Sequence, residues 1–153
     1  MIAQETKTIA SRFSRISTSA ANVIRDANAA YLSLVNGGGD RISQFFSADY
    51  TVHLTERKMN GGRDLVRTVA AKYASAFSGL KLDVDILAEQ SDRVAWLRVF
   101  RGTLTGAFHG FPASGREIIW RDMVTSRLAD GLIVEEWVVS DLAERLLMSR
   151  KQS

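Results

Sequence analysis

Residues 102–141 decide the fold of this chain, and they read GTLTGAFHGFPASGR (102–116), EIIWRDMVTSRLADG (117–131) and LIVEEWVVSD (132–141). The first segment is a glycine-rich loop that holds Pro112, the only proline of the chain. The other two segments alternate between apolar and polar residues, as strands with one buried face do. The dipeptide Asp130-Gly131 between them favours a two-residue type I′ hairpin turn. The stretch therefore predicts an antiparallel hairpin that is entered from a long loop.

Working outward from this hairpin, the chain predicts further strands before it and helices toward both ends. A first helix is predicted by hydroxyl side chains at 17–19, apolar residues at helical spacing after them and glycines from Gly37 onward. Shorter patterns predict helices at 42–46 and 63–77. A last helix is expected after a Ser140 cap. Helices followed by an antiparallel meander predict an α+β fold, with helices packed on one face of a curved, mostly antiparallel sheet. The expected strands are 50–55, 81–90, 93–106, 117–128 and 132–140.

The composition excludes several function classes. A length of 153 residues with 46% hydrophobic residues fits one domain with a real core. The net charge of +3 is small and the arginines are scattered, so we expect no nucleic-acid partner. No apolar run approaches the roughly 20 residues of a membrane span, so no membrane partner is expected either. The chain has no cysteine, which excludes disulfides and thiolate sites and favours a cytoplasmic location.

The N-terminal residues 1–22 are expected to form a leader in front of a domain at 23–153. Residues 7–25 contain four basic residues and no acidic one, with apolar residues at helical spacing (Ile9, Phe13, Ile16). An organelle transit peptide has this composition, and so does an amphipathic helix that packs on the body or on a partner chain. We favour the helix. A secretory signal is excluded because its apolar segment is missing.

Short motifs follow one another in a recognisable order along residues 30–148. They are FFSADYTVH (45–53), AFSGL (76–80), SDRV (91–94), GTLTG (102–106), GFPASGR (110–116) and RLADGLIVEEW (127–137). In order and spacing they resemble the SnoaL-like polyketide cyclase and ester cyclase family of the nuclear transport factor two-like superfold. The resemblance implies a cone-shaped α+β barrel around an apolar pocket, often in a homodimer.

The resemblance also implies where the family's chemistry would lie. Its cyclases use a His and an Asp on the two strands that flank the Asp-Gly turn, and alignment puts Val124 and Val138 at those places. An aliphatic side chain neither donates nor accepts a proton, so an aldol cyclisation by that dyad is not predicted. In the ketosteroid isomerases of the superfold, Tyr31 falls at the oxyanion-binding tyrosine, but Leu54 falls at the catalytic aspartate.

Strand alternation indicates which polar groups the pocket could still hold. The even-numbered residues of three strands share a face with positions 124 and 138. Its charged members, Arg98, Asp122 and Glu136, would be enclosed by an apolar, tryptophan-rich wall, where burial requires pairing or raises the pKa of a carboxyl. The predicted inner face consists of Val94, Trp96, Arg98, Phe100, Leu104, Ile118, Trp120, Asp122, Val124, Ser126, Leu132, Val134, Glu136, Val138 and Ser140.

Two functions of different classes fit these observations. The first is a small cofactor-independent enzyme that performs cyclase, isomerase or hydrolase type proton chemistry on a hydrophobic, polyketide-like or carbonyl-bearing molecule, with Asp122, His53 and Arg98 as catalytic residues. No metal site is expected, because His53 and His109 lack the spacing of metal ligands. The expected substrate-binding residues are Tyr31, Trp96, Phe100, Phe108, Trp120, Val124, Glu136 and Val138.

The second function is a non-catalytic small-molecule-binding or assembly domain. The replacement of the dyad by Val124 and Val138 motivates it, and folds of this kind host both roles. Structural interpretations of the polar residues also stay open. Asp122 and Arg98 could form only an ion pair, Glu136 could lie at the rim, and His53 could be a hydrogen-bonded core residue.

The opposite strand face predicts a partner. A monomer would expose much of it as an apolar patch, and sheet-to-sheet pairing in a twofold homodimer would cover it. The alternative is that the leader helix covers this face within one chain. The predicted outer face consists of Leu97, Val99, Ile119, Met123, Ile133, Trp137 and Val139.

Overall fold

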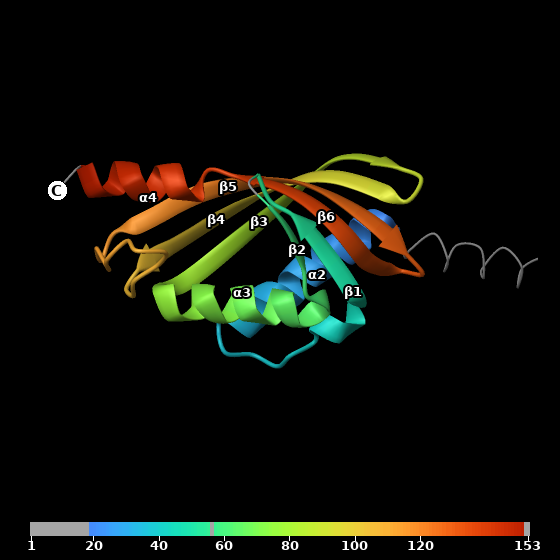
Figure 1. Ribbon diagram of the computed structural model, residues 1–153, viewed down its shortest axis with the longest axis horizontal. Helices are drawn as coiled ribbons and strands as arrows, with labels where there is room; N and C mark the ends of the chain where they lie inside the picture. Colours follow the sequence, from blue (N-terminus) through green and yellow to red (C-terminus); the bar gives the residue numbers. More distant parts are fainter. Residues whose placement is uncertain (1–18, 56, 152–153) are drawn as a thin grey trace, which may run out of the picture.

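The computed structural model describes residues 19–55 and 57–151 of the chain (Figure 1). Within these residues, three α-helices and one 3-10 helix frame six strands. The helices are α2 (Ala20–Val35), η1 (Ile42–Gln44), α3 (Gly62–Ala76) and α4 (Leu142–Lys151). The strands are β1 (Phe46–His53), β2 (Lys58–Asn60), β3 (Phe77–Gln90), β4 (Arg93–Leu104), β5 (Glu117–Ala129) and β6 (Leu132–Ser140).

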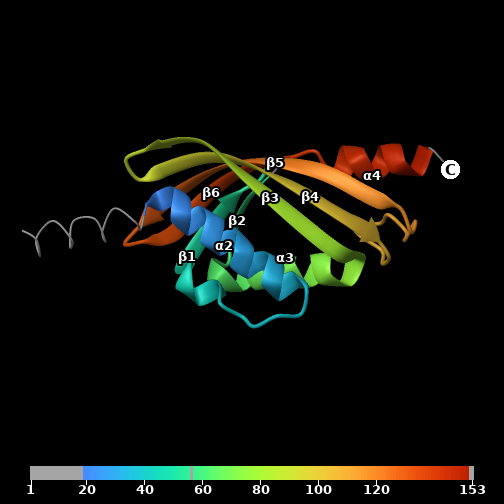
Figure 2. The same ribbon diagram turned by 180° about the vertical axis from the view of Figure 1, so that it is seen from behind.

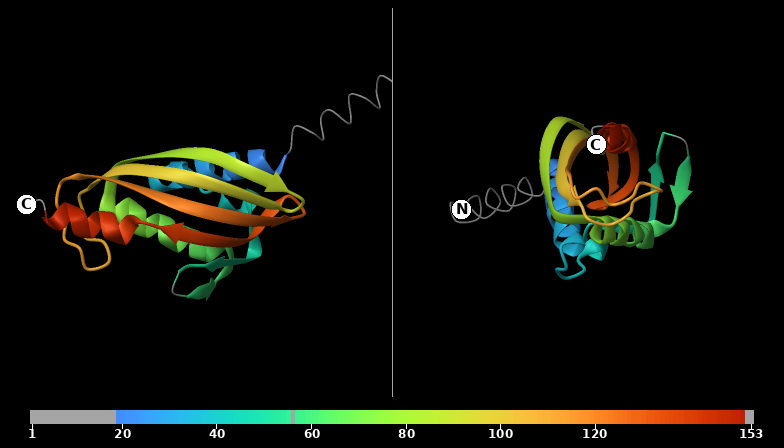
Figure 3. Two further views of the ribbon diagram at one scale, coloured as in Figure 1. Left: turned by 90° about the horizontal axis from the view of Figure 1, so that it is seen from above. Right: turned by 90° about the vertical axis from the view of Figure 1, so that its left-hand side faces the viewer.

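The strands form one curved sheet in the order β2-β1-β6-β5-β4-β3. All neighbours are antiparallel except β1 and β6, which run parallel. Among the described residues the sheet stays open, with β2 and β3 at its edges. Helices α2 and α3 lie along its concave face (Figures 1 and 2), and the end-on view of Figure 3 shows the sheet curling around the interior above them. This arrangement confirms the predicted α+β fold.

Local sequence signals explain the ends of the elements. Ser19 caps α2, and its hydroxyl accepts a hydrogen bond from the Asn22 backbone N–H at 3.2 Å. The Ser140 hydroxyl accepts one from the Leu142 N–H at 3.2 Å, at the start of α4. Asp130 and Gly131 have φ angles of 53° and 75°, which both central residues of a type I′ turn require. The predicted hairpin turn is therefore confirmed.

The predicted boundaries were wrong at several places. Phe77 begins β3 instead of ending the preceding helix, with φ −118° and ψ 135°. A buried phenylalanine satisfies a helical and a strand pattern equally well, so periodicity could not separate them. β1 begins at Phe46 rather than at Tyr50, the strand 93–106 ends at Leu104, and β2 was not predicted.

The inner face of β6 departs from strict alternation. Arg127 pairs with Glu135 and Leu128 pairs with Ile133, so Val134 is an extra residue in the strand. Such a bulge reverses the faces on its two sides. Ile133, expected on the outer face, is therefore fully buried in the core, whereas the expected inner residues Leu132 and Val134 are only half-buried.

Residues 1–18 of the expected leader (1–22) lie outside the described residues. Residues 20–22 belong to α2. Within the described part of the chain, no helix combines the length and the apolar character that crossing a bilayer requires.

Gly106 supplies a test of how the end of β4 is anchored. Its N–H donates to the Ala76 carbonyl at 3.0 Å, and a Cβ at this position would lie 2.1 Å from the Ser75 carbonyl oxygen. We expect Gly106→Ala to lower the free energy of unfolding by about 1–3 kcal/mol, because the backbone must shift to relieve the clash. Urea unfolding measures this change.

Gly39→Ala is the matched control for this variant. A Cβ at Gly39 meets nothing within 4 Å, so the change should stay within about 0.5 kcal/mol. Equal stability of the two variants would contradict the close packing of Gly106 against the end of α3.

Candidate functional site

The interior between the sheet and helices α2 and α3 is lined by aromatic side chains from β4 and β5. Trp96, Phe100 and Trp120 are almost completely buried, as the alternation predicted. The Trp120 ring lies 4.8 Å from Phe100 and 4.8 Å from Phe77 between centroids. Tyr73 of α3 faces the same cluster, with its ring 5.8 Å from that of Trp120. This packing makes the wall of the interior rigid and apolar.

An ion pair lies within this apolar wall. Arg98 on β4 and Asp122 on β5 are directly opposite residues, and Arg98 Nε donates to Asp122 Oδ2 at 2.8 Å. Arg98 also donates through Nη1 to Asn28 Oδ1 at 3.3 Å, and its guanidinium lies over the Phe100 ring at 5.0 Å. Burial is the largest single influence and works against the charge of Arg98. The combined influence of Asp122, Glu136 and the two buried tyrosines outweighs it, so the pKa of Arg98 is raised. Arg98 therefore stays charged and holds one oxygen of Asp122.

The second oxygen of Asp122, Oδ1, lacks a hydrogen-bond partner within the described part of the chain. Asp122 is 2% exposed, and its Oδ1 forms no hydrogen bond with any of the described residues. A buried polar atom without a partner is costly and calls for an explanation. Oδ1 is the one acceptor position that this ion pair leaves open.

A second polar group lies on the same face, around Glu136. Tyr50 donates to Glu136 Oε1 at 2.7 Å, and the Ser126 hydroxyl bonds Oε2 at 2.5 Å. Ser126 in turn accepts from Trp96 Nε1 at 2.8 Å. Burial raises the pKa of Glu136, although the hydrogen bonds from Ser126 and Tyr50 act in the opposite direction. Glu136 is therefore a buried, fully hydrogen-bonded carboxyl rather than a rim residue.

The two polar groups flank an aliphatic pair. Val124 and Val138 lie opposite each other across β5 and β6, between the Asp122–Ser140 pair and the Ser126–Glu136 pair. Residues on one face of a strand repeat every two positions, about 7 Å apart. Each carboxyl thus lies one such step from the valine pair, Asp122 along β5 and Glu136 along β6.

Tyr31 of α2 and Tyr73 of α3 bring two further hydroxyls toward the ion pair. Their rings meet edge to face at 6.3 Å. Burial, followed by the influence of Tyr73, raises the pKa of Tyr31 well above its ordinary value; burial and the charge of Asp122 raise that of Tyr73. Both hydroxyls therefore keep their protons and are hydrogen-bond donors.

His53 does not join this group. It faces outward from β1, where its Nε2 lies 2.6 Å from Glu135 Oε2 and its ring stacks on Trp137 at 4.9 Å. The expected constellation of His53 with Asp122 and Arg98 is therefore brought together only in part. His109 lies in the loop after β4, where its ring meets Phe108 edge to face at 4.3 Å.

That loop closes one end of the interior. Phe108 and Phe111 exchange backbone hydrogen bonds of 2.9 and 2.8 Å around His109 and Gly110, whose φ angles are 46° and 84°. The ring of Phe108 turns inward and stacks on Tyr73 at 5.6 Å. Phe108 therefore lies in the aromatic cluster, and its expected contact with a substrate stays a prediction.

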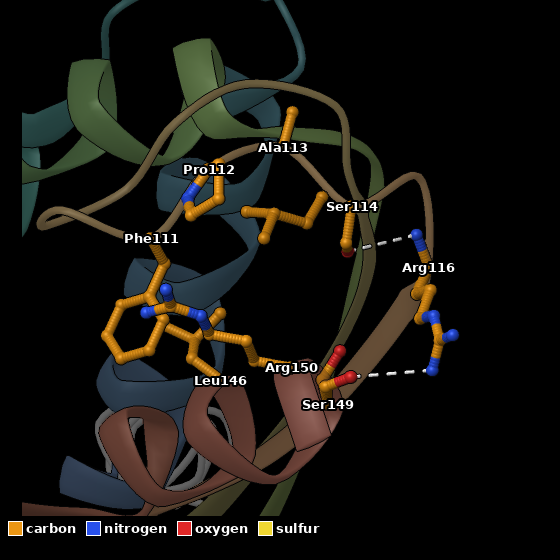
Figure 4. Close-up of a pocket in the computed structure, with 9 residues that line it drawn as sticks. Phe111, Pro112, Ala113, Ser114, Arg116, Leu146, Ser149 and Arg150 are labelled. Atoms are coloured by element: carbon orange, nitrogen blue, oxygen red, sulfur yellow. Dashed lines mark hydrogen bonds between the residues drawn. The ribbon is translucent and has the colours of Figure 1, made fainter. Parts of the chain in front are cut away.

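A hollow of about 390 Å³ lies between the same loop and α4 (Figure 4). The loop residue Phe111 and Leu146 of α4 both line it, and Arg116 donates to the Ser149 carbonyl at 3.4 Å at one side. None of the predicted site residues lines this hollow. Leu104 and Leu146 line the hollow and are also buried in the core, so they join it to the interior.

Sequence reasoning missed Asn28, Tyr50 and Tyr73 as members of the site. Asn28 and Tyr73 occupy helix positions where core packing is the default interpretation. Tyr50 stood on a strand whose pairing with β6 could not be foreseen. No three His, Asp or Glu side chains gather to hold a metal ion anywhere in the part of the chain that the structure describes.

The sequence matches a known protein family. A profile of the SnoaL-like polyketide cyclases matches residues 25–147. The chain belongs to the SnoaL-like polyketide cyclase family. This membership supports the activity class of a small cofactor-independent cyclase or isomerase. A search of curated proteins found no match.

Solved structures agree with this assignment. IdmH from Streptomyces antibioticus, described as a candidate polyketide cyclase, is 27% identical with a TM-score of 0.66, over 83% of this chain and 97% of that one. AclR from Streptomyces galilaeus, described as a candidate hydroxylase, is 25% identical with a TM-score of 0.69, over 87% and 83%. TsrD from Streptomyces laurentii shows the same fold at 23% identity, with a TM-score of 0.68, over 82% and 95%.

The raised pKa of Glu136 predicts a pH-dependent contribution to stability. A carboxyl whose pKa is raised in the folded state stabilises the fold at pH values below its pKa in the unfolded chain, which is ordinarily 4.5. This stabilisation is lost as the pH rises through the pKa of the folded state. Glu136→Gln cannot ionise. We therefore expect the stability of the variant relative to the parent to improve as the pH rises from about 4 to about 8.

Urea unfolding across this pH range measures the difference. Glu117→Gln, at an exposed carboxyl on β5, is the matched control. If the difference in unfolding free energy between the parent and Glu136→Gln did not change with pH, Glu136 would ionise as easily in the folded chain as in the unfolded one.

Proposed function

We propose that the protein is a cofactor-independent enzyme that moves a proton next to the carbonyl group of a hydrophobic, polyketide-like small molecule. Asp122 is the proton acceptor, and Arg98 holds it in place. The observation that carries the proposal is the free, buried oxygen of Asp122 beside a permanent positive charge, on the apolar inner face of the sheet. Family membership supports the reaction class.

The chemistry follows from the geometry of the ion pair. Asp122 Oδ1 takes the proton from the carbon beside the carbonyl, and the electrons of that C–H bond form an enolate. Asp122 becomes neutral in this step, so the positive charge of Arg98 then balances the enolate. The proton returns to the same carbon, to another carbon in an isomerisation, or to the oxygen formed when the enolate attacks a second carbonyl in a cyclisation.

The surrounding hydroxyls suit the charge that develops. Tyr31 and Tyr73 keep their protons because burial raises the pKa of both, so either can donate to an enolate oxygen. Donors fixed in an apolar interior are more effective than the same groups in water. The aromatic residues Trp96, Phe100, Phe108 and Trp120, with Val124 and Val138, would contact the apolar body of the substrate.

Deuterium exchange tests the proposal without knowledge of the natural substrate. In heavy water, the protein should accelerate the exchange of the protons beside the carbonyl of 1-tetralone, followed by nuclear magnetic resonance. Asp122→Asn should reduce this acceleration by about 100-fold or more, since an amide is not a base. His53→Gln should keep the parental rate, because His53 faces away from the interior.

The asparagine variant leaves Arg98 without its counter-charge, which can unfold a protein. The double variant Arg98→Met with Asp122→Asn removes both charges and serves as a folded control. A folded Asp122→Asn protein that exchanges 1-tetralone as fast as the parent would exclude Asp122 as the base.

A non-catalytic binding or assembly domain is the second candidate. It is favoured by the aliphatic pair Val124–Val138 and by the dense aromatic packing of the interior. For this function the parent protein should bind 1-tetralone or similar ketones without any exchange above that in buffer. The deuterium experiment therefore separates the two functions.

We also propose a twofold homodimer through the outer face of the sheet. Met123 and Val139 lie opposite each other on β5 and β6 and are 57% and 63% exposed. Leu97, Ile119 and Trp137 are half-buried on the same face. An apolar surface of this kind is typical of an interface.

The double variant Met123→Lys with Val139→Lys places like charges at the centre of the proposed interface. Light scattering at micromolar concentration should show a dimer for the parent and a monomer for the variant. Lys72→Glu, at an exposed position of α3 on the concave side of the sheet, should leave the dimer intact. A parent protein that is monomeric under these conditions would remove the proposal.

A further inference from the structure

Trp120 has an indole N–H that its surroundings do not use. The residue is 0% exposed, and its Nε1 finds no hydrogen-bond acceptor among the described residues. Trp96, the neighbouring tryptophan of the same wall, donates its own Nε1–H to Ser126 at 2.8 Å. Buried indole N–H groups usually have such a partner. The free donor on Trp120 is therefore an exception within one cluster.

This free donor lies beside a free acceptor. Trp120 and Asp122 point to the same face of β5, one alternation step or about 7 Å apart along the strand. Within residues 19–55 and 57–151, Asp122 Oδ1 is the other unpartnered buried atom on this face. One unsatisfied donor and one unsatisfied acceptor therefore line the same part of the interior, each at a cost to stability that a ligand would remove.

Phe108 occupies the space in front of this wall. It stacks on Tyr73 at 5.6 Å with an interplanar angle of 25°, and it lies 5.8 Å from Phe77. Tyr73 and Phe77 are also the direct neighbours of Trp120. Phe108 comes from a loop rather than from a strand or a helix, and a loop can move without breaking the sheet.

The hollow between the loop and α4 gives this movement a direction. Phe111, held to Phe108 by the two backbone hydrogen bonds of the turn, lines the hollow together with Leu146 and Leu104. A turn that shifts toward α4 would carry Phe108 out of the aromatic cluster. The apolar side chains around the hollow would cover the displaced ring.

We propose that Phe108 holds the place of a flat aromatic ligand, and that Trp120 Nε1 recognises the carbonyl oxygen of that ligand. The ring of the ligand replaces Phe108 against Tyr73 and Phe77. A hydroxyl at its other end donates to Asp122 Oδ1. The ligand is then an aromatic hydroxyketone, and Trp120 is its recognition residue. This inference rests on the proposed function for the open acceptor at Asp122. In this pose the hydroxyl occupies Oδ1 and the carbon beside the carbonyl lies out of its reach, so the ligand competes with the substrate for Asp122.

Three related probes separate the two hydrogen bonds. The compound 6-hydroxy-1-tetralone carries both groups, 1-tetralone lacks the hydroxyl, and 5,6,7,8-tetrahydro-2-naphthol lacks the carbonyl. Calorimetry on the parent protein should find 6-hydroxy-1-tetralone the tightest ligand, by about tenfold over each of the others, since a site built for a polar group rejects the analogue that lacks it.

Two variants assign the contacts to residues. Trp120→Phe should weaken 6-hydroxy-1-tetralone by about tenfold and leave the naphthol unchanged, because only the carbonyl contact is lost. Phe108→Ala should tighten all three probes, because no ring has to be displaced. Trp137→Phe on the outer face is the matched control and should bind as the parent does. If Trp120→Phe bound 6-hydroxy-1-tetralone as tightly as the parent does, the proposal would be overturned.

A second measurement keeps the test decisive if Trp120→Phe does not fold. The chain has three tryptophans, and the variants Trp96→Phe and Trp137→Phe assign the indole N–H signals of a nitrogen-15 spectrum. The Trp120 signal should shift downfield with 6-hydroxy-1-tetralone and not with the naphthol. A signal that responds equally to both probes would also overturn the inference. Binding as expected without deuterium exchange would instead remove the proposed function and leave this site in place.

Discussion

The interior of this protein depends on the register that joins β4, β5 and β6. This register sets Arg98 opposite Asp122, Val124 opposite Val138 and Ser126 opposite Glu136, all on the concave face. A slip of one residue would turn both carboxyls toward solvent and move the outer residues inward. The Asp130-Gly131 turn and the bulge at Val134 fix the register at the β5–β6 connection. Packing, charge pairing and the candidate chemistry all follow from this alignment.

The buried charges are tolerated for different reasons. Asp122 faces the guanidinium of Arg98, which Asn28 and two aromatic rings hold in place, so attraction offsets the loss of hydration. Glu136 has no basic group bonded to it and depends on the hydroxyls of Tyr50 and Ser126. Burial consequently raises the pKa of Glu136. Two carboxyls on one face thus experience opposite environments, although the sequence shows both simply as acids on strands.

The period of two along a strand explains how much of the site could be predicted. It put Arg98, Trp120 and Asp122 on the inner face correctly, because β4 and β5 pair without interruption there. It misplaced Ile133, because a bulge leaves no mark in an apolar run such as Leu132-Ile133-Val134. It could not place His53, since the pairing of β1 with β6 joins segments more than 80 residues apart, as the spacing of 82 between His53 and Glu135 shows. Long-range contacts of this kind have no local signal.

The position of the polar groups relative to the valine pair constrains any reaction in this interior. In a strand, one alternation step moves a side chain by about 7 Å, which is longer than a hydrogen bond can span. A substrate seated for a proton donor and acceptor at positions 124 and 138 would meet only methyl groups. A substrate that uses Asp122 must lie nearer the end closed by Phe108, with its body against Phe77, Phe100 and Trp120. The aromatic cluster lies at that end, so the apolar contacts and the free carboxylate oxygen favour the same placement.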